Sequence, residues 1–430
     1  MNKSIFSSKI FPFILVALIS STVTAYGTYF LWHLQKPNYI ILSEEEAKAL
    51  EQKTNKKFDA DYAITFDKNS VDFENIKKYN EVKRLLSTYY YEDINQNDML
   101  EGSIAGMVNA LNDPYTVYFT KDQMKVFEEK TSGSYVGIGV SLNMGEDGLL
   151  TVVEAFPDSP AKKVGIMTGD KIVKVDDQDV TTISDQDYIV SMIKGEEKTK
   201  VKITVFRPSE GTYLDFDIIR EKIKVENITS EVIDGDIGYI KMSMFDSEMA
   251  KYFGNHLNKL LDKKIKGLII DLRDNPGGDY NEVCAIADRL LPEGLIVYTE
   301  DKFGNRSEKK SDAKEFDLPL AILVNGNSAS ASEILSGAVK DHNKGTLIGT
   351  KTFGKGLVQA VQELEDGSGL KVTIARYFTP SGVCIHKEGI EPDIVVELDE
   401  KYSNMPVSQV PREDDTQLKK ALEVIREQIG

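Results

Sequence analysis

A long, mostly apolar segment without charged side chains near the N-terminus is the first feature of the hydrophobic pattern. Residues 10–32 contain no charged side chain, and Lys3 and Lys9 precede them. A helix needs about 20 apolar residues to cross a bilayer, and basic residues before it favour an N-terminus that stays inside. We therefore predict a transmembrane signal anchor at 10–32, with residues 1–9 in the cytoplasm. A cleaved signal peptide is the alternative, because Val23-Thr24-Ala25 resembles a signal peptidase site.

A polar stretch and a helical pattern follow. Residues 33–70 are mostly polar and are expected to form a stalk. Beyond residue 71, apolar side chains recur mostly three positions apart, which places them on one face of a helix. They are Phe73, Ile76, Tyr79, Val82, Leu85 and Leu86. A second helix is predicted over 99–111, where the turn Asn112-Asp113-Pro114 ends it. We expect a helical cap region over 71–133.

Short β-rich runs separated by Gly, Asp and Pro turns characterise residues 134–208. The runs are 135–142, 149–155, 171–175 and 200–206, with one helical segment at 185–194. A segment of this length is sufficient for a small, mostly β domain.

From residue 234 the pattern alternates between strands and helices. Predicted strands are 237–242, 267–271, 321–324, 346–348 and 371–377, and predicted helices are 246–263, 281–291, 332–340 and 417–428. Continuously apolar strands such as Leu268-Ile269-Ile270 are typical of a sheet that is covered on both faces. The predicted fold class is therefore mixed α/β (α+β), with the β-rich domain inserted between the helical cap and the core.

Charge and composition narrow the function. The 430 residues include 52 Lys and Arg against 69 Asp and Glu, a formal net charge of −17, so the phosphates of a nucleic acid would be repelled. Two cysteines cannot form a disulfide framework, and the histidines show no paired metal-ligand spacing. We expect no nucleic-acid partner, no metal and no cofactor.

The most informative local segment is 324–333, which carries alternating serines. It lies where a predicted strand ends and a helix begins, so free backbone N–H groups are available to a developing oxyanion. On the residues alone, the segment is equally well explained as a serine-rich helix N-cap. If it is a site, Ser328, Ser330 and Ser332 are all candidate nucleophiles.

Two glycine-containing turns accompany this segment. Residues 349–356 nearly spell a phosphate-binding loop, but Gly356 replaces the hydroxyl residue and an apolar strand follows in place of a helix. We therefore exclude a nucleotide site. Residues 271–278 follow a buried strand and end in a double glycine that can turn backbone amides toward a site, although alone this is an ordinary tight turn.

Together and in this order, the segments resemble the C-terminal processing (tail-specific) serine protease family. The resemblance extends from about Val71 to Leu398. Further matching segments are 111–115, 237–240, 379–382 and 389–393. The resemblance implies a serine protease core over 209–402, followed by a linker and C-terminal helix over 403–430.

The resemblance also assigns catalytic roles. Ser330 matches the nucleophile, Lys355 the general base, and Gln359 the residue that orients the lysine. A serine hydroxyl needs a base to take its proton, and a lysine can do so only when its pKa is lowered enough for the amine to be neutral. The oxyanion would be bound by the backbone amides of Ala331 and of Gly277 or Gly278.

The β-rich domain over 134–208 is similar to PDZ domains. Its carboxylate-binding loop and edge strand would include Gly137, Ile138, Gly139 and Val140. A protein C-terminus would add as a β-strand beside this edge. In relatives an arginine often precedes the glycine that is Gly195 here, and helps to couple the domain to the protease. Here that residue is Lys194, which lacks the bidentate fork of arginine, and this leaves the coupling open.

The sequence thus predicts a membrane-anchored serine endopeptidase that binds protein C-termini through its PDZ domain and cleaves with a Ser-Lys dyad assisted by Gln. Its catalytic body would be on the extracytoplasmic side of the cell membrane, or secreted if the signal is cleaved. The alternative is a catalytically silent, membrane-tethered PDZ scaffold. A homo-oligomer is left open, since the helices over 71–86 and 417–428 could pair between subunits.

Overall fold

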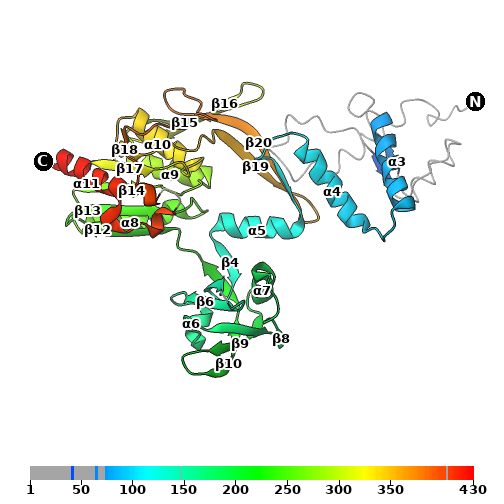
Figure 1. Ribbon diagram of the computed structural model, residues 1–430. Helices are drawn as coiled ribbons and strands as arrows, with labels where there is room; N and C mark the ends of the chain where they lie inside the picture. The colour runs from blue at the N-terminus through cyan, green and yellow to red at the C-terminus, as the bar shows by residue number, and fades with distance from the viewer. Residues whose placement is uncertain (1–39, 43–62, 66–72, 146, 403–404) are drawn as a thin grey trace, which may run out of the picture. The chain divides into compact units, whose positions relative to one another are not determined.

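The computed structural model describes residues 40–42, 63–65, 73–145, 147–402 and 405–430 (Figure 1). The predicted anchor over 10–32 and most of the predicted stalk lie outside these residues. None of the helices that the structure describes is both long enough and apolar enough to span a membrane. The chain divides into two compact units, residues 1–100 and 101–430.

The first unit contains an antiparallel strand pair and a helix. Strand β1 (Ile40–Leu42) pairs with β2 (Ala63–Thr65), and α3 spans Phe73–Tyr89. This helix confirms the predicted helical periodicity. The next helix, α4 (Gln96–Asn109), begins in this unit and continues into the second.

A six-stranded sheet forms the centre of the second unit, in the order β12-β13-β14-β17-β18-β21. The strands are β12 (Ile228–Ile233), β13 (Ile237–Met242), β14 (Gly267–Asp271), β17 (Leu320–Val324), β18 (Thr346–Gly349) and β21 (Ile394–Val395). Strand β12 is antiparallel to β13, and the other neighbours are parallel. Parallel neighbours require crossover connections, so this part of the chain alternates between strands and helices as predicted.

Helices cover both faces of this sheet, which confirms the prediction made from its continuously apolar strands. They are α8 (Met249–Asp262), α9 (Tyr280–Leu290), α10 (Ala331–Asp341) and α11 (Thr416–Ile429). Leu268 and Ile270 join an apolar core with α8, α9 and α10, whereas Ile269 joins a second core with α11. Successive residues of a strand point to opposite faces, so β14 contributes to both cores. Figure 1 shows α11, in red, against β14 and β17.

The apolar face of α11 is used within the chain. Its buried side chains are Leu418, Ala421, Val424 and Ile425, and they pack against the sheet. This apolar face is therefore covered by the chain's own sheet, and the pairing of the helix between subunits stays a prediction that would have to use another face.

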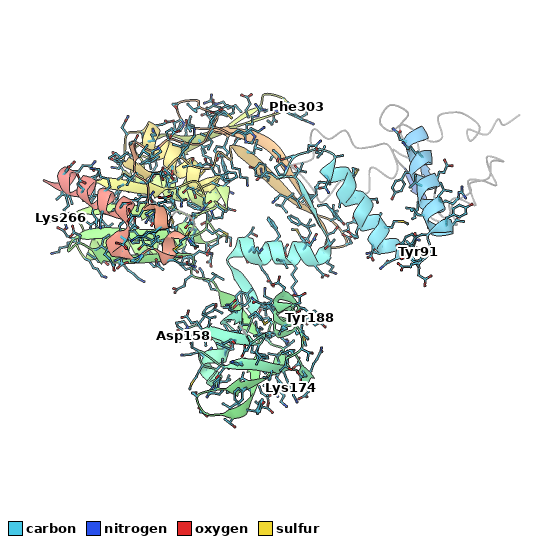
Figure 2. The ribbon with its side chains drawn as sticks, in the orientation of Figure 1. Tyr91, Asp158, Lys174, Tyr188, Lys266 and Phe303 are labelled. Carbon is cyan, nitrogen blue, oxygen red and sulfur yellow. The ribbon has the colours of Figure 1, made fainter. Side chains whose placement is uncertain are left out.

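A second, antiparallel sheet has the order β16-β15-β20-β19, with β3 also paired to β20. Its strands are β3 (Val117–Phe119), β15 (Gly294–Asp301), β16 (Arg306–Ser311), β19 (Leu357–Glu363) and β20 (Gly369–Phe378). Strands β15 and β16 were not predicted. For β16 the reason is that its side chains are charged and mostly exposed and offer no alternation. Phe303, labelled in Figure 2, lies in the turn between them.

The β-rich domain contains a third sheet, in the order β10-β9-β7-β6-β5, with β8 paired to β7. Its elements are β5 (Val140–Met144), β6 (Leu150–Ala155), α6 (Pro160–Val164), β7 (Lys171–Val175), β8 (Gln178–Asp179), α7 (Gln186–Ile193), β9 (Lys200–Arg207) and β10 (Thr212–Ile219). Strand β10 pairs with β9 along its whole length. The domain therefore extends to residue 219 and the predicted boundary at 208 is too early, because the turn after Arg207 closes a hairpin within the domain.

The predicted strand 135–142 is two strands in the structure. Strand β4 (Ser134–Gly137) pairs with β11 (Glu221–Lys224), whereas β5 pairs with β6. The break falls at Ile138 and at Gly139, whose φ of 75° favours glycine. Helix α5 (Lys121–Ser132) precedes β4. The β4–β11 ribbon therefore carries the chain into and out of the β-rich domain.

Candidate active site

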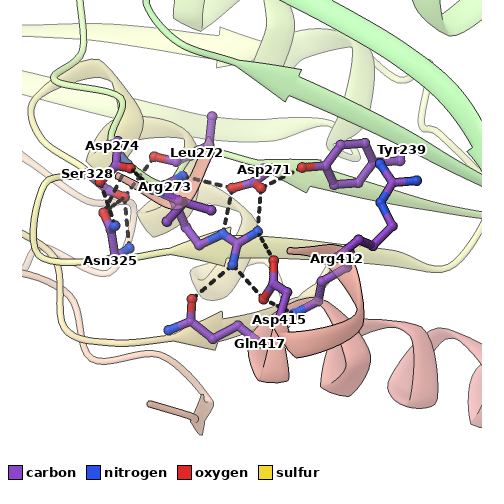
Figure 3. Close-up of polar contacts among 12 residues, drawn as sticks. Tyr239, Asp271, Leu272, Arg273, Asp274, Asn325, Ser328, Arg412, Asp415 and Gln417 are labelled. Carbon is purple, nitrogen blue, oxygen red and sulfur yellow. Dashed lines mark hydrogen bonds and ion pairs between the residues drawn. The ribbon is translucent and has the colours of Figure 1, made fainter. Parts of the chain in front are cut away.

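Two turns at the carboxyl ends of adjacent parallel strands form the centre of the candidate site. One follows β14 and the other follows β17. The Asp274 carboxylate accepts hydrogen bonds from Nδ2 of Asn325 and of Asn327, both at 2.9 Å, and the Asp274 N–H donates to Asn325 Oδ1 at 3.0 Å (Figure 3). Ligands of α/β proteins bind beyond this edge of the sheet, so these bonds fix the turns where a substrate would lie.

The three candidate serines have different environments. Ser328 Oγ donates to the carbonyl of Leu272 at 2.8 Å, and Ser332 Oγ donates to the carbonyl of Asn275 at 2.9 Å. Both serines have an exposed fraction of 0%. Ser330, between them, is partly exposed. The outer two hydroxyls therefore connect the two turns, and Ser330 is the member of the set that solvent reaches.

Ser330 has an unusual backbone conformation, with φ 55° and ψ −112°, immediately before α10 begins at Ala331. A residue other than glycine in such a region costs about 1–3 kcal/mol and is often found at functional sites. The surrounding contacts must hold it there, and the strongest of these involve two residues that the sequence did not single out for this purpose.

Glu333 is the first of these residues. It is fully buried, and its Oε1 accepts from Thr352 Oγ1 at 2.6 Å and from Gly354 N at 2.7 Å. Its Oε2 accepts from the backbone N–H groups of Ser330 and Lys355, both at 2.9 Å. Burial raises the pKa of Glu333, and these donors oppose the shift because they bind the charged carboxylate. One side chain thus holds the backbones of Ser330 and Lys355 together.

Tyr377 on β20 is the second. Its hydroxyl lies 3.0 Å from the carbonyl oxygen of Ser330 and 2.5 Å from that of Lys355. Only 1% of the residue is exposed. The position of Glu333 at a helix start, at the end of the serine segment, is a weak signal for its role. Nothing marked Tyr377 within its alternating strand.

The Lys355 side chain lies in a partly buried position, with Nζ 5.0 Å from the centroid of the Tyr115 ring. Burial, and then the positive charge of Lys371, lower the pKa of Lys355, against the opposing charges of Glu333 and Asp113. Among the hydrogen bonds of the described residues, none joins Lys355 Nζ to Ser330 or to Gln359. The structure therefore brings the backbones of Ser330 and Lys355 together without a bond between their side chains.

Gln359 lies on β19, next to a register shift between Val358 and Gln359. Its Nε2 is buried and has no hydrogen-bond partner among the described residues. A buried amide without a partner is costly, so this group is available to a neighbour that moves or to a substrate.

The double glycine lies directly against the Ser330 turn. A Cβ atom on Gly277 would lie 2.8 Å from Ser330 Cβ and 2.9 Å from Ala331 N. The Gly277 N–H donates to Asn275 Oδ1 at 2.9 Å. The amides of Gly278 and Ala331 have no acceptor among the described residues. Of the two alternatives left by the sequence, Gly278 therefore has the available N–H group.

A buried ion-pair network lies beside these turns and reaches the C-terminal helix (Figure 3). Arg273 donates to Asp271 through Nε and Nη2 and to Asp415 through Nη1 and Nη2, at 2.6–2.9 Å. Its Nη1 also donates to Gln417 Oε1 at 3.0 Å, and the Tyr239 hydroxyl donates to Asp271 at 2.6 Å. The network ties the start of α11 to the turn that carries Gly277 and Gly278.

The β-rich domain contains a groove of about 290 Å³ between β5 and α7. Its lining includes the four predicted residues Gly137, Ile138, Gly139 and Val140, together with Gln186, Val190, Ile193 and Lys194. The amides of Ile138 and Gly139 have no acceptor among the described residues. Two adjacent free N–H groups are suited to a carboxylate.

Lys194, at the position where the resemblance implies an arginine, contacts one residue that lines the groove and one that lies outside it. Its Nζ forms an ion pair with Glu129 of α5 at 2.6 Å and lies 5.0 Å from the centroid of the Tyr135 ring. The β-rich domain is therefore linked by this lysine to the helix that precedes it.

Three family models match parts of this chain. Residues 236–396 match the model of peptidase family S41, residues 136–219 that of a PDZ domain, and residues 21–123 that of the activating protease CtpB N-terminal domain.

Three relatives match most of the chain. The carboxy-terminal processing protease CtpA of Bacillus subtilis (strain 168) is 35% identical over 331 residues, which cover 76% of this chain and 70% of that protein. A probable CtpA-like serine protease of Staphylococcus aureus (strain MRSA252) is 36% identical over 345 residues, with 79% and 68% covered. The carboxy-terminal-processing protease of Bartonella bacilliformis is 35% identical over 358 residues, with 80% and 81% covered. This chain therefore belongs to peptidase family S41, among the C-terminal processing proteases.

Proposed function

We propose that this protein is a membrane-anchored serine endopeptidase that cleaves with Ser330 and Lys355 and binds protein C-termini through its PDZ domain. One observation carries the catalytic part of the proposal. Glu333 and Tyr377 each hold the backbones of both Ser330 and Lys355, through contacts of 2.5–3.0 Å. Two buried side chains that each contact the same pair of residues are expected if that pair acts as a unit.

Ser330 would attack the carbonyl carbon of the scissile peptide bond. As the Oγ–C bond forms, the hydroxyl proton passes to the neutral amine of Lys355. Burial and the charge of Lys371, which lower the pKa of Lys355, favour this neutral amine. Side-chain rotation of Lys355 away from the Tyr115 ring, or substrate binding, has to bring Nζ to the hydroxyl.

The negative charge that develops on the carbonyl oxygen would be bound by the amides of Ala331 and Gly278, for which the described residues provide no other acceptor. The Lys355 ammonium then gives its proton to the leaving amine as the C–N bond breaks. Water hydrolyses the resulting ester, with Lys355 again accepting a proton. Gln359 Oε1 would accept a hydrogen bond from Lys355 Nζ and so orient it. No cofactor is required.

The groove of the PDZ domain would hold the substrate tail. The free amides of Ile138 and Gly139 would bind the α-carboxylate, and the apolar side chains of Val190 and Ile193 favour an apolar last residue. The apolar segment 10–32 would anchor the protein in the cell membrane, with the catalytic body outside the cytoplasm.

A serine-directed fluorophosphonate probe tests the assignment. We expect it to label the wild-type protein on a peptide that contains Ser330, and to leave Ser330→Ala unlabelled and inactive against peptide substrates. Ser328→Ala is the matched control from the same segment and should still be labelled, because Ser328 Oγ is bonded to a carbonyl. Absence of labelling and of cleavage in folded wild-type protein would favour the silent PDZ scaffold.

A change of Lys371 should move the pH dependence of cleavage. The base must be neutral, so activity rises with pH through the pKa of Lys355. Replacing Lys371 with Gln removes a positive charge that lowers this pKa, and the rising limb of the kcat/KM profile should therefore move to higher pH. Lys371→Arg keeps the charge and should leave the limb in place. Identical profiles for Lys371→Gln and the wild type would show that Lys371 does not act on the base.

A further inference from the structure

The open edge of β5 offers a limited number of backbone groups to a bound peptide. Gly145 N donates to Leu149 O, and Phe156 N donates to Gly139 O. The backbone groups of Gly139 and Gly145 therefore point toward β6. In an antiparallel strand alternate residues direct their N–H and C=O groups to opposite sides. The register of β5 with β6 is continuous with these bonds apart from one shift. Val140, Leu142 and Met144 therefore direct their backbone groups to the open edge.

The N–H group of Met144, the last of these three residues, already has a hydrogen-bond acceptor. The Met144 N–H donates to Oε1 of Gln186 at 3.1 Å. Gln186 is the first residue of α7, the helix that forms the opposite wall of the groove. Its side chain therefore crosses from one wall to the other at the end away from Ile138 and Gly139.

The remaining residues of α7 show that Gln186 belongs to the groove face. Gln186, Val190 and Ile193 all line the groove, and a spacing of four and three residues puts them on one side of a helix. Tyr188, labelled in Figure 2, is 50% exposed and lies on the opposite side. The hydrogen bond between Gln186 and Met144 thus crosses the end of the groove and does not lie on the outer surface of the helix.

We propose that Gln186 sets the length of tail that the PDZ groove reads. This inference rests on the proposed binding of protein C-termini. With the carboxylate at Ile138 and Gly139, the outward groups of Val140 meet the last residue of the tail and those of Leu142 the third from the end. Those of Met144 would meet the fifth from the end. Because Gln186 holds the Met144 N–H, the recognised tail is limited to about four residues, and preceding residues leave the groove.

Peptides of two lengths test this in full-length protein that carries Ser330→Ala, so that they are not consumed. Fluorescent peptides of four and eight residues share the same last four residues and end in Val. They are titrated into three such proteins, one that retains Gln186, one with Gln186→Ala and one with Gln186→Glu. In the protein that retains Gln186, the longer peptide should bind less than about twofold better. In the Gln186→Ala protein, the longer peptide should gain about 3- to 10-fold, as expected for one additional neutral hydrogen bond.

Gln186→Glu is the matched control, because a carboxylate also accepts from the Met144 N–H and should keep the length limit. Amide hydrogen exchange gives an independent readout without peptide: the Met144 N–H should exchange faster in Gln186→Ala than in the other two proteins. If the affinity depended on peptide length equally in all three proteins, the role of Gln186 would be overturned, but the proposed binding of C-termini would not. Failure of both peptides to bind to any of them would instead overturn the proposed binding of C-termini, and this inference with it.

Discussion

Replacing Lys355 with Arg is expected to lower kcat by about 10³- to 10⁴-fold, the range in which a general base contributes to catalysis. A guanidinium stays protonated at any pH at which the protein is folded. The variant therefore keeps the positive charge and most of the side-chain volume but cannot accept the proton of Ser330. The measurement is steady-state cleavage of a fluorogenic peptide, with thermal unfolding followed in parallel to show that the fold is intact.

Lys351→Arg is the control for this experiment. Lys351 lies in the same loop, and its exposed side chain pairs with Glu391 at 3.0 Å, so an arginine can make the same contact. We expect activity within about twofold of the wild type, as is usual for surface substitutions away from a site. A Lys355→Arg variant that retained more than one tenth of the wild-type kcat would rule out Lys355 as the base.

The largest effect on stability is expected at Arg273. Only 1% of this residue is exposed, and it forms ion pairs with two buried carboxylates, Asp271 and Asp415. Burial acts to raise the pKa of Asp271, but the charge and hydrogen bonds of Arg273 outweigh it and keep that pKa below its usual value. Arg273→Met leaves both carboxylates buried without their cationic partner. The free energy of unfolding should fall by about 3–5 kcal/mol, measured by urea titration with far-UV circular dichroism.

Arg412→Met provides the comparison. Arg412 forms an ion pair with Glu231 in which both side chains are about half exposed. An exposed pair of this kind contributes at most about 1 kcal/mol, so the urea midpoint should change little. If Arg273→Met were as stable as Arg412→Met, the buried network would not be what holds α11 to the turn beside the site.

The strands and helices of the core were predictable because their side chains carry a regular pattern. The strands β13 and β14 were predicted with the bounds that the structure has. Their apolar residues face helices on both sides, and continuous burial leaves a continuous apolar run in the sequence. Strand β16 shows the opposite case, since its charged side chains are mostly exposed and no burial imposes a pattern on them.

The three serines of the segment 328–332 were indistinguishable from the residues alone, and the family resemblance was needed to choose Ser330. The structure distinguishes them by contacts with a turn 56 and 57 residues earlier, where Ser328 and Ser332 donate to Leu272 and Asn275. The same holds for the double glycine, because only the bond from Gly277 to Asn275 separates its amide from that of Gly278.

The sequence by itself determined the alternation of elements, the insertion of a β-rich domain and the candidate serines, lysine and glycines among which the catalytic roles are proposed. These depend on side-chain type and on spacing along the chain. The tertiary structure decided what holds Ser330 beside Lys355, through Glu333 and Tyr377, and how Gln186 closes the groove at Met144. Those contacts join segments that are distant in sequence, and a hydrogen bond between distant segments leaves no period in the pattern of either one.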